Sequence, residues 1–119
     1  MNSFINLGFS IEEIQMMMNT NILIQNQPDD ILKESIALLK KIGCQTIQIK
    51  NIIHTNPFYF NQDGKKVIKM IQYLQDCGIT NIPVLLDMNP YLLNYSVEEL
   101  KRIVSKSSCK EYLLDHILI

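Results

Sequence analysis

Apolar residues recur along the chain at intervals of three and four residues, in two alternating kinds of stripe. The first kind comprises Ile11, Ile14, Met17 and Met18; then Ile49, Ile52 and Ile53; then Ile82, Leu85 and Leu86. The second comprises Leu32, Ile36, Leu39 and Ile42; then Val67, Ile71, Leu74 and Cys77; then Leu100, Ile103 and Val104. This spacing places apolar side chains on one face of an α-helix and does not fit a strand. The pattern therefore predicts an all-α chain.

A hexapeptide bracketed by asparagines separates the two stripes each time. The copies are NILIQN at 21–26, NPFYFN at 56–61 and NPYLLN at 89–94. Pro57 and Pro90 cannot continue the preceding helix, and each moves the asparagine before it out of the α region. Asparagine side chains mimic a backbone turn and tolerate left-handed geometry. Each hexapeptide is therefore predicted to reverse the chain between two helices.

The apolar residues inside the hexapeptides allow two interpretations. In the first, which we favour, they fill the joint between stacked helix pairs, with Phe60 and Leu93 as the buried side chains. In the second, Tyr59 and Tyr91 point outward as platforms on which nucleic-acid bases stack.

Gly8, Gly43 and Gly78 are spaced by 35 residues and each follows a second stripe, as a left-handed helix cap would. Helix starts are expected at three capping boxes (Ser10 with Glu13, Ser96 with Glu99, Ser108 with Glu111), at Asp63, after Thr80 with Pro83 in the first turn, and with Pro28 in a first turn.

Together these signals predict one domain, residues 1–119, with repeats at about 8–42, 43–77 and 78–107 and a terminal helix at 108–118. The expected fold class is all-α: a short right-angle-stacked helical-repeat solenoid of about three helix-turn-helix units. Partial repeats are expected at its ends, where Phe4 and Leu7 match the end of a second helix.

The repeated motif resembles that of the mitochondrial transcription termination factors. The resemblance rests on LQDCGITNIPVLLDMNPYLLNYSVEELKRIV, residues 74–104, and LLKKIGCQTIQIKNIIHTNPFYFN, residues 38–61. It implies a helical-repeat solenoid that cradles nucleic acid on a concave basic face. Members of that family have more repeats than this chain and a more basic face.

Composition fits a globular domain, with 47% apolar and 19% charged residues in 119. The formal net charge of −1 does not by itself indicate a nucleic-acid partner. Residues 36–70, however, contain six lysines against one aspartate: Lys40, Lys41, Lys50, Lys65, Lys66 and Lys69. This basic middle repeat is our candidate contact for nucleic acid or an acidic partner. The alternative is an ordinary solvated surface, in which Lys40 and Lys41 complement a helix dipole.

No motif in the sequence indicates catalysis, a cofactor, a metal site or a small-molecule substrate. The three cysteines, far apart along the chain, are expected to be buried thiols, and no apolar run is long enough for a membrane span. A cytoplasmic, non-enzymatic binding module follows, either for nucleic acid or for a protein partner. A self-associating scaffold belongs to the second class, because a short solenoid leaves apolar faces at its ends.

Overall fold

The computed structural model describes residues 2–103, which contain helices and no strands. The α-helices are α1 (Asn2–Asn6), α2 (Ile11–Thr20), α3 (Asp29–Ile42), α4 (Thr46–Thr55), α5 (Gly64–Asp76), α6 (Ile82–Met88) and α7 (Val97–Ile103). The 3₁₀ helices are η1 (Ile22–Asn26), η2 (Pro57–Asn61) and η3 (Pro90–Asn94). The prediction of an all-α chain is confirmed for these residues.

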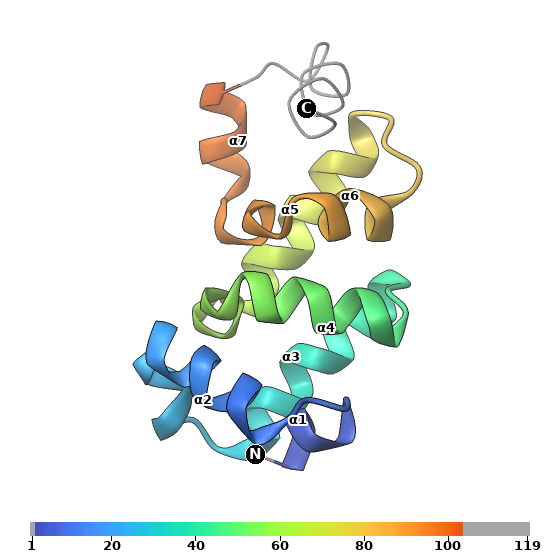
Figure 1. Ribbon diagram of the computed structural model, residues 1–119. Coiled ribbons are helices and arrows are strands. Elements are labelled where there is room, and N and C mark those ends of the chain that lie inside the picture. Colours follow the sequence, from blue (N-terminus) through green and yellow to red (C-terminus); the bar gives the residue numbers. More distant parts are fainter. Residues whose placement is uncertain (1, 104–119) are drawn as a thin grey trace.

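The order helix, 3₁₀ helix, helix occurs three times, as α2-η1-α3, α4-η2-α5 and α6-η3-α7, which we call units 1, 2 and 3. The molecule is elongated, about 43 × 24 × 23 Å. Figure 1 shows unit 1 at one end with α1, and unit 3 at the other. The short helix α1 packs against α3, as the end of a second helix would, and α5 packs against α7.

The three glycines end their helices in the left-handed conformation, with φ of 94° at Gly8, 108° at Gly43 and 94° at Gly78. At Gly43 the backbone N–H donates to Lys40 O, and the N–H of Cys44 donates to Leu39 O. These bonds satisfy carbonyls that have no partner inside the helix. The predicted caps are confirmed.

The helix starts agree with the sequence at three of the predicted positions. Ser10 and Glu13 exchange side-chain and backbone hydrogen bonds, as do Ser96 and Glu99. Asp63 accepts from the backbone N–H of Lys65. The predicted box at Ser108 and Glu111 lies outside the described residues.

Two other starts differ from the prediction. Pro28 precedes the first helical residue of α3 instead of lying in its first turn. Helix α6 is capped by Asn81, whose side chain accepts from the N–H of Val84, and not by Thr80. With Asn81 as the cap, Pro83 is the second helical residue, where its missing N–H leaves no bond unmade.

The predicted stripes form the core, with one exception. Ile14, Leu39 and Leu74 are buried, as are most other stripe residues whose side chains are described, whereas Ile11 is 69% exposed. Ile11 is the first residue of α2, and at that position no neighbouring element covers its side chain. Its assignment to the core was wrong.

The hexapeptides form the 3₁₀ helices and the joints between units. Phe60 and Leu93 are buried, which confirms the favoured interpretation. Phe60 meets the ring of Phe4 edge-to-face at a centroid distance of 5.3 Å. Within residues 2–103 only glycines have a positive φ. The hexapeptide asparagines therefore do not adopt the left-handed geometry that asparagine tolerates.

Tyr59 does not point outward. Its side chain is 2% exposed, and its hydroxyl donates to Ser35 O at 2.6 Å. Burial raises the pKa of this hydroxyl well above the ordinary value for tyrosine. Tyr91 is exposed, as the second interpretation expected. The two tyrosines differ because Tyr59 is the fourth residue of its hexapeptide and Tyr91 the third; Phe58, the third residue in unit 2, is exposed as well.

Asn21, the first residue of the first hexapeptide, links the first two hexapeptides. The amide nitrogen of Asn21 donates to Pro57 O and to Asn61 Oδ1, both at 3.0 Å. The amide nitrogen of Asn61 donates in return to Asn21 Oδ1 at 3.4 Å. Position 1 of one hexapeptide thus binds positions 2 and 6 of the next.

The same joint links units 2 and 3. The amide nitrogen of Asn56 donates to Pro90 O and to Asn94 Oδ1 at 3.0 Å, and that of Asn94 donates to Asn56 Oδ1 at 3.1 Å. Asn21 and Asn56, the two asparagines that donate to the next hexapeptide along the chain, are both buried. Buried amides are stable only when they are paired, so these bonds fix how successive units stack.

Candidate nucleic-acid interface

The six predicted lysines occupy three separate places in the structure. Lys40 and Lys41 lie in the last turn of α3, Lys50 in α4, and the other three near the start of α5: Lys65, Lys66 and Lys69. Helix α4, about 15 Å long at 1.5 Å per residue, and η2 separate the first place from the third along the chain. The six lysines of the basic middle repeat are therefore carried by three different helices.

Two of the six amines hold units together. Lys50 Nζ donates to Gly8 O at 3.1 Å and lies 5.1 Å from the centroid of the Phe9 ring. Lys66 Nζ donates to Gln62 Oε1 at 2.6 Å and to Asn94 O at 3.0 Å. A change at either position would disturb contacts between units, so neither is a clean test of binding.

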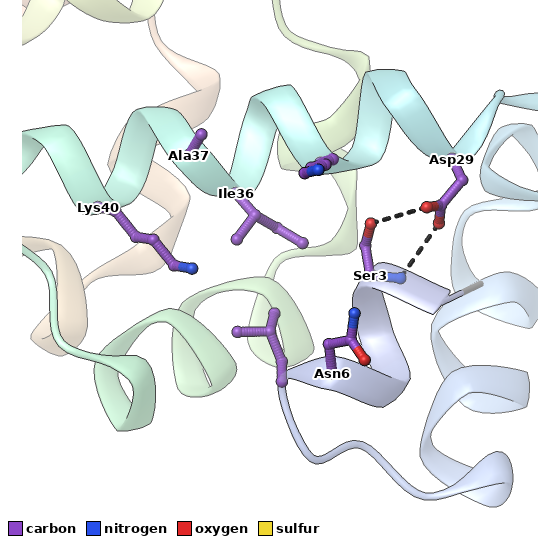
Figure 2. Close-up of a pocket in the computed structure, with 8 residues that line it drawn as sticks. Ser3, Asn6, Asp29, Ile36, Ala37 and Lys40 are labelled. Atoms are coloured by element: carbon purple, nitrogen blue, oxygen red, sulfur yellow. Dashed lines mark hydrogen bonds between the residues drawn. The ribbon is translucent and has the colours of Figure 1, made fainter.

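Lys40 borders a pocket of about 250 Å³ between α1 and α3 (Figure 2). At the far end of the pocket, the backbone N–H and hydroxyl of Ser3 both donate to the carboxylate of Asp29. Lys33 also lines the pocket. This pocket is thus lined by two lysines and by one carboxylate that Ser3 already binds.

A second hollow, of about 270 Å³, lies between the starts of α5 and α7. It is lined by Asp63, Lys65, Lys66, Lys69, Ser96, Val97 and Glu98. Three of the six predicted lysines therefore meet at this hollow. Helix α7, which packs against α5, adds two exposed cations outside the basic middle repeat, Lys101 and Arg102.

Lys69 and Arg102 occupy equivalent positions in units 2 and 3. Each follows by two residues a buried apolar residue of its helix, Val67 and Leu100 respectively. The amine of Lys101 lies 5.8 Å from the centroid of the Tyr73 ring. This contact places the amine against α5, the helix that carries Lys65 and Lys69. We call Lys65, Lys69, Lys101 and Arg102, all exposed, the α5–α7 basic face.

Carboxylates limit the charge of this face. Asp63 and Glu98 line the same hollow as Lys65. Glu99 lies nearby, and its pKa is lowered mainly by the hydrogen bond from the backbone N–H of Ser96, with smaller contributions from Lys66 and Arg102. Lys65 and Lys69 therefore share their hollow with two carboxylates, and Arg102 lies close enough to Glu99 to contribute to its lowered pKa.

The signal for the missed cations was present in the sequence. Counting charge in consecutive blocks separates Lys69 from Lys101 and Arg102, whereas aligning the units on their hexapeptides places them side by side. Stacked repeats gather residues from equivalent positions, so charge in such a chain is best counted by position.

Two cysteines lie within the described residues. Burial, with a contribution from Asp87, raises the pKa of the Cys44 thiol to about 11, so this buried cysteine is protonated at neutral pH. Cys77 is half-buried, and Cys109 lies outside the described residues. No group of three or more potential metal ligands occurs within residues 2–103. In the same span no helix has the length and apolar character needed to cross a membrane.

Comparison with known proteins identifies the family. The profile of the mTERF family matches residues 19–108, a segment that begins in α2 and includes all three hexapeptides. No curated protein and no solved structure gave a significant match. The family match covers most of the chain and agrees with the helical units and their asparagine hexapeptides. The chain therefore belongs to the mTERF family.

Proposed function

We propose that the chain is a non-catalytic nucleic-acid-binding module, a short solenoid of three stacked units that contacts phosphates through the α5–α7 basic face. Membership in a family of nucleic-acid-binding helical-repeat proteins supports the ligand class. The observation that carries the site is the position of Lys69, Lys101 and Arg102 on two neighbouring second helices, all three exposed.

The small number of cations on this face determines the expected affinity for nucleic acid and its dependence on salt. Three phosphate contacts to duplex DNA would give a slope of about −2.7 in log K against log salt concentration, at roughly −0.9 per contact. A net charge of −1 adds no long-range attraction, so binding depends on this local face. Dissociation constants in the range of about 10⁻⁴–10⁻⁶ M follow, as for binding without sequence recognition.

Fluorescence anisotropy with single- and double-stranded DNA and RNA across a salt series tests the proposal. The variant Lys69→Glu with Arg102→Glu should lose binding and keep its helical content. Lys40→Glu with Lys41→Glu, at the end of α3, is the matched control because it reverses the same number of charges elsewhere. Equal loss in both variants would show that total charge matters and the α5–α7 basic face does not.

The double variant Lys65→Glu with Lys69→Glu tests the site as the sequence first indicated it. It should also abolish binding, because both residues line the hollow between α5 and α7. Affinity unchanged from wild type in this variant would exclude nucleic-acid binding through the α5–α7 basic face and leave the protein-interaction alternative.

A further inference from the structure

The two asparagine joints leave one incomplete joint at each end of the described structure. Asn21 and Asn56 are buried and bound to the following hexapeptide. Asn89, which holds the same position in unit 3, is half-buried, and its side chain makes no hydrogen bond within residues 2–103. Unit 3 therefore presents the donor half of a joint.

Unit 1 presents the opposite half. Asn26 is the counterpart of Asn61 and Asn94, yet its side chain is exposed and has no hydrogen-bond partner in the described part of the chain. Ile22 is the counterpart of Pro57 and Pro90, which are both buried, whereas Ile22 is 67% exposed.

The difference at Ile22 has an identifiable cause. Helix α2 packs on η2, and helix α4 packs on η3, so each proline is covered by the first helix of the preceding unit. In the described structure no first helix precedes unit 1, because α1 corresponds to the end of a second helix. What would cover Ile22 is thus known from two examples in the same molecule: an amphipathic helix ending in an asparagine that points forward.

We infer that unit 3 of a second copy of this chain docks on unit 1, with Asn89 of one copy reaching the carbonyl of Ile22 and the side chain of Asn26 of the next. The donor and acceptor halves match because both are versions of the joint that already forms twice within the chain. Asparagine side chains carry both donors and an acceptor, so the reciprocal bond from Asn26 to Asn89 is also available.

This contact joins two different surfaces, so it is heterologous and does not close on itself as a symmetric dimer does. Copies would associate head to tail, continuing the order of units from one chain into the next. Within the chain, the covalent connection between units keeps the two halves of each joint at a high effective concentration. Between chains, only the protein concentration brings the two halves together. The association should therefore be weak and strongly concentration-dependent.

Sedimentation velocity of the 119-residue protein without nucleic acid is the direct measurement. Species larger than the monomer should grow in as the protein concentration rises toward about 1 mM, the order of the effective concentration that a short tether provides. Ile22→Glu and Asn89→Ala should each return the protein to a monomer, one from either half of the joint. Ile47→Glu is the matched control, because Ile47 is 74% exposed on α4 and lies in neither half-joint.

Mixing the two variants provides the decisive result. The Ile22→Glu chain keeps an intact donor half and the Asn89→Ala chain an intact acceptor half, so an equal mixture should form a dimer and nothing larger. Circular dichroism of each variant checks that the units remain folded. A wild-type protein that stays monomeric throughout, association that neither variant alters, or a mixture that fails to dimerise would each overturn the inference. All three results are independent of Lys69, Lys101 and Arg102, so failure of head-to-tail association leaves the nucleic-acid proposal standing.

Discussion

Replacing Asn56 with alanine tests whether the asparagine joint stabilises the fold. Asn56 is completely buried, and its carboxamide takes part in three hydrogen bonds, with Pro90 O and, in both directions, with Asn94. At about 1 kcal/mol each, these bonds contribute roughly 3 kcal/mol, and the carbonyl of Pro90 left buried without this donor adds to the loss. The change should therefore lower the free energy of unfolding by about 3–4 kcal/mol. The melting temperature should fall by roughly 10 °C or more for a domain of this size.

Asn89→Ala is the control, because Asn89 also precedes a proline and has nearly the same backbone angles, with φ −139° and ψ 79° against −127° and 75° at Asn56. Its side chain makes no hydrogen bond within residues 2–103, so the expected cost is below about 0.5 kcal/mol. Urea denaturation followed by circular dichroism, at protein concentrations too low for association, gives both values. Similar losses in the two variants would refute the reasoning, since the effect would then come from the backbone before proline and not from the joint.

Further predictions address the core, the hexapeptide and the helix caps. Leu74→Ala should lower the free energy of unfolding by roughly 2–5 kcal/mol; a loss under about half a kcal/mol in urea titrations would contradict its place in the core. Phe60→Ala should cost about 3–5 kcal/mol, and a thermal melt like that of wild type would exclude a role in the joint. Tyr59→Phe should cost about 1 kcal/mol through loss of the hydroxyl bond to Ser35 O, which chemical denaturation can measure. The pKa of Glu13 is lowered in the fold, chiefly by the hydrogen bond from the backbone N–H of its serine cap, so the unfolded chain binds more protons in acid. Its stabilising effect should be present above the unfolded pKa and disappear as pH falls through the folded one; melts of wild type and Glu13→Gln should differ at pH 7 and converge in strong acid.

Local features of the fold could be predicted from the sequence because they depend on neighbouring residues. The left-handed cap at Gly43, the box of Ser10 with Glu13 and the apolar face of α3 each follow from residues within a turn or two. The same reasoning missed the reciprocal box of Gln45 with Gln48 at the start of α4, because glutamine is an uncommon cap.

The joints could not be derived in this way, because the partners of Asn21 lie 36 and 40 residues further along the chain. Local rules assign asparagine to turns, so a role in the turn is the one they predict for the hexapeptide asparagines. One signal pointed elsewhere: NILIQN keeps both asparagines although it has Ile22 in place of proline. An asparagine pair that persists without the turn-forming proline serves something other than the turn.

The lysines selected from the sequence lie on three different helices. Lys65 and Lys69 lie beside the hollow between α5 and α7, whereas Lys40 and Lys41 lie in the last turn of α3 and Lys50 binds the carbonyl of Gly8, in the turn before α2. The spread arises because consecutive residues of a repeat protein are distributed over its length and faces, and only equivalent positions adjoin.

The asparagine joint also bears on how such a chain could change its length. A joint needs position 1 from one hexapeptide and positions 2 and 6 from the next, and nothing in it depends on which unit supplies them. Excision of residues 22–56 would fuse Asn21 directly to Pro57, and the resulting hexapeptide would face Pro90 and Asn94 with the same groups that Asn56 presents now. Duplication across the same boundary would add a unit with equally compatible ends. Recombination within the hexapeptide therefore changes the number of units while each asparagine joint keeps its chemistry.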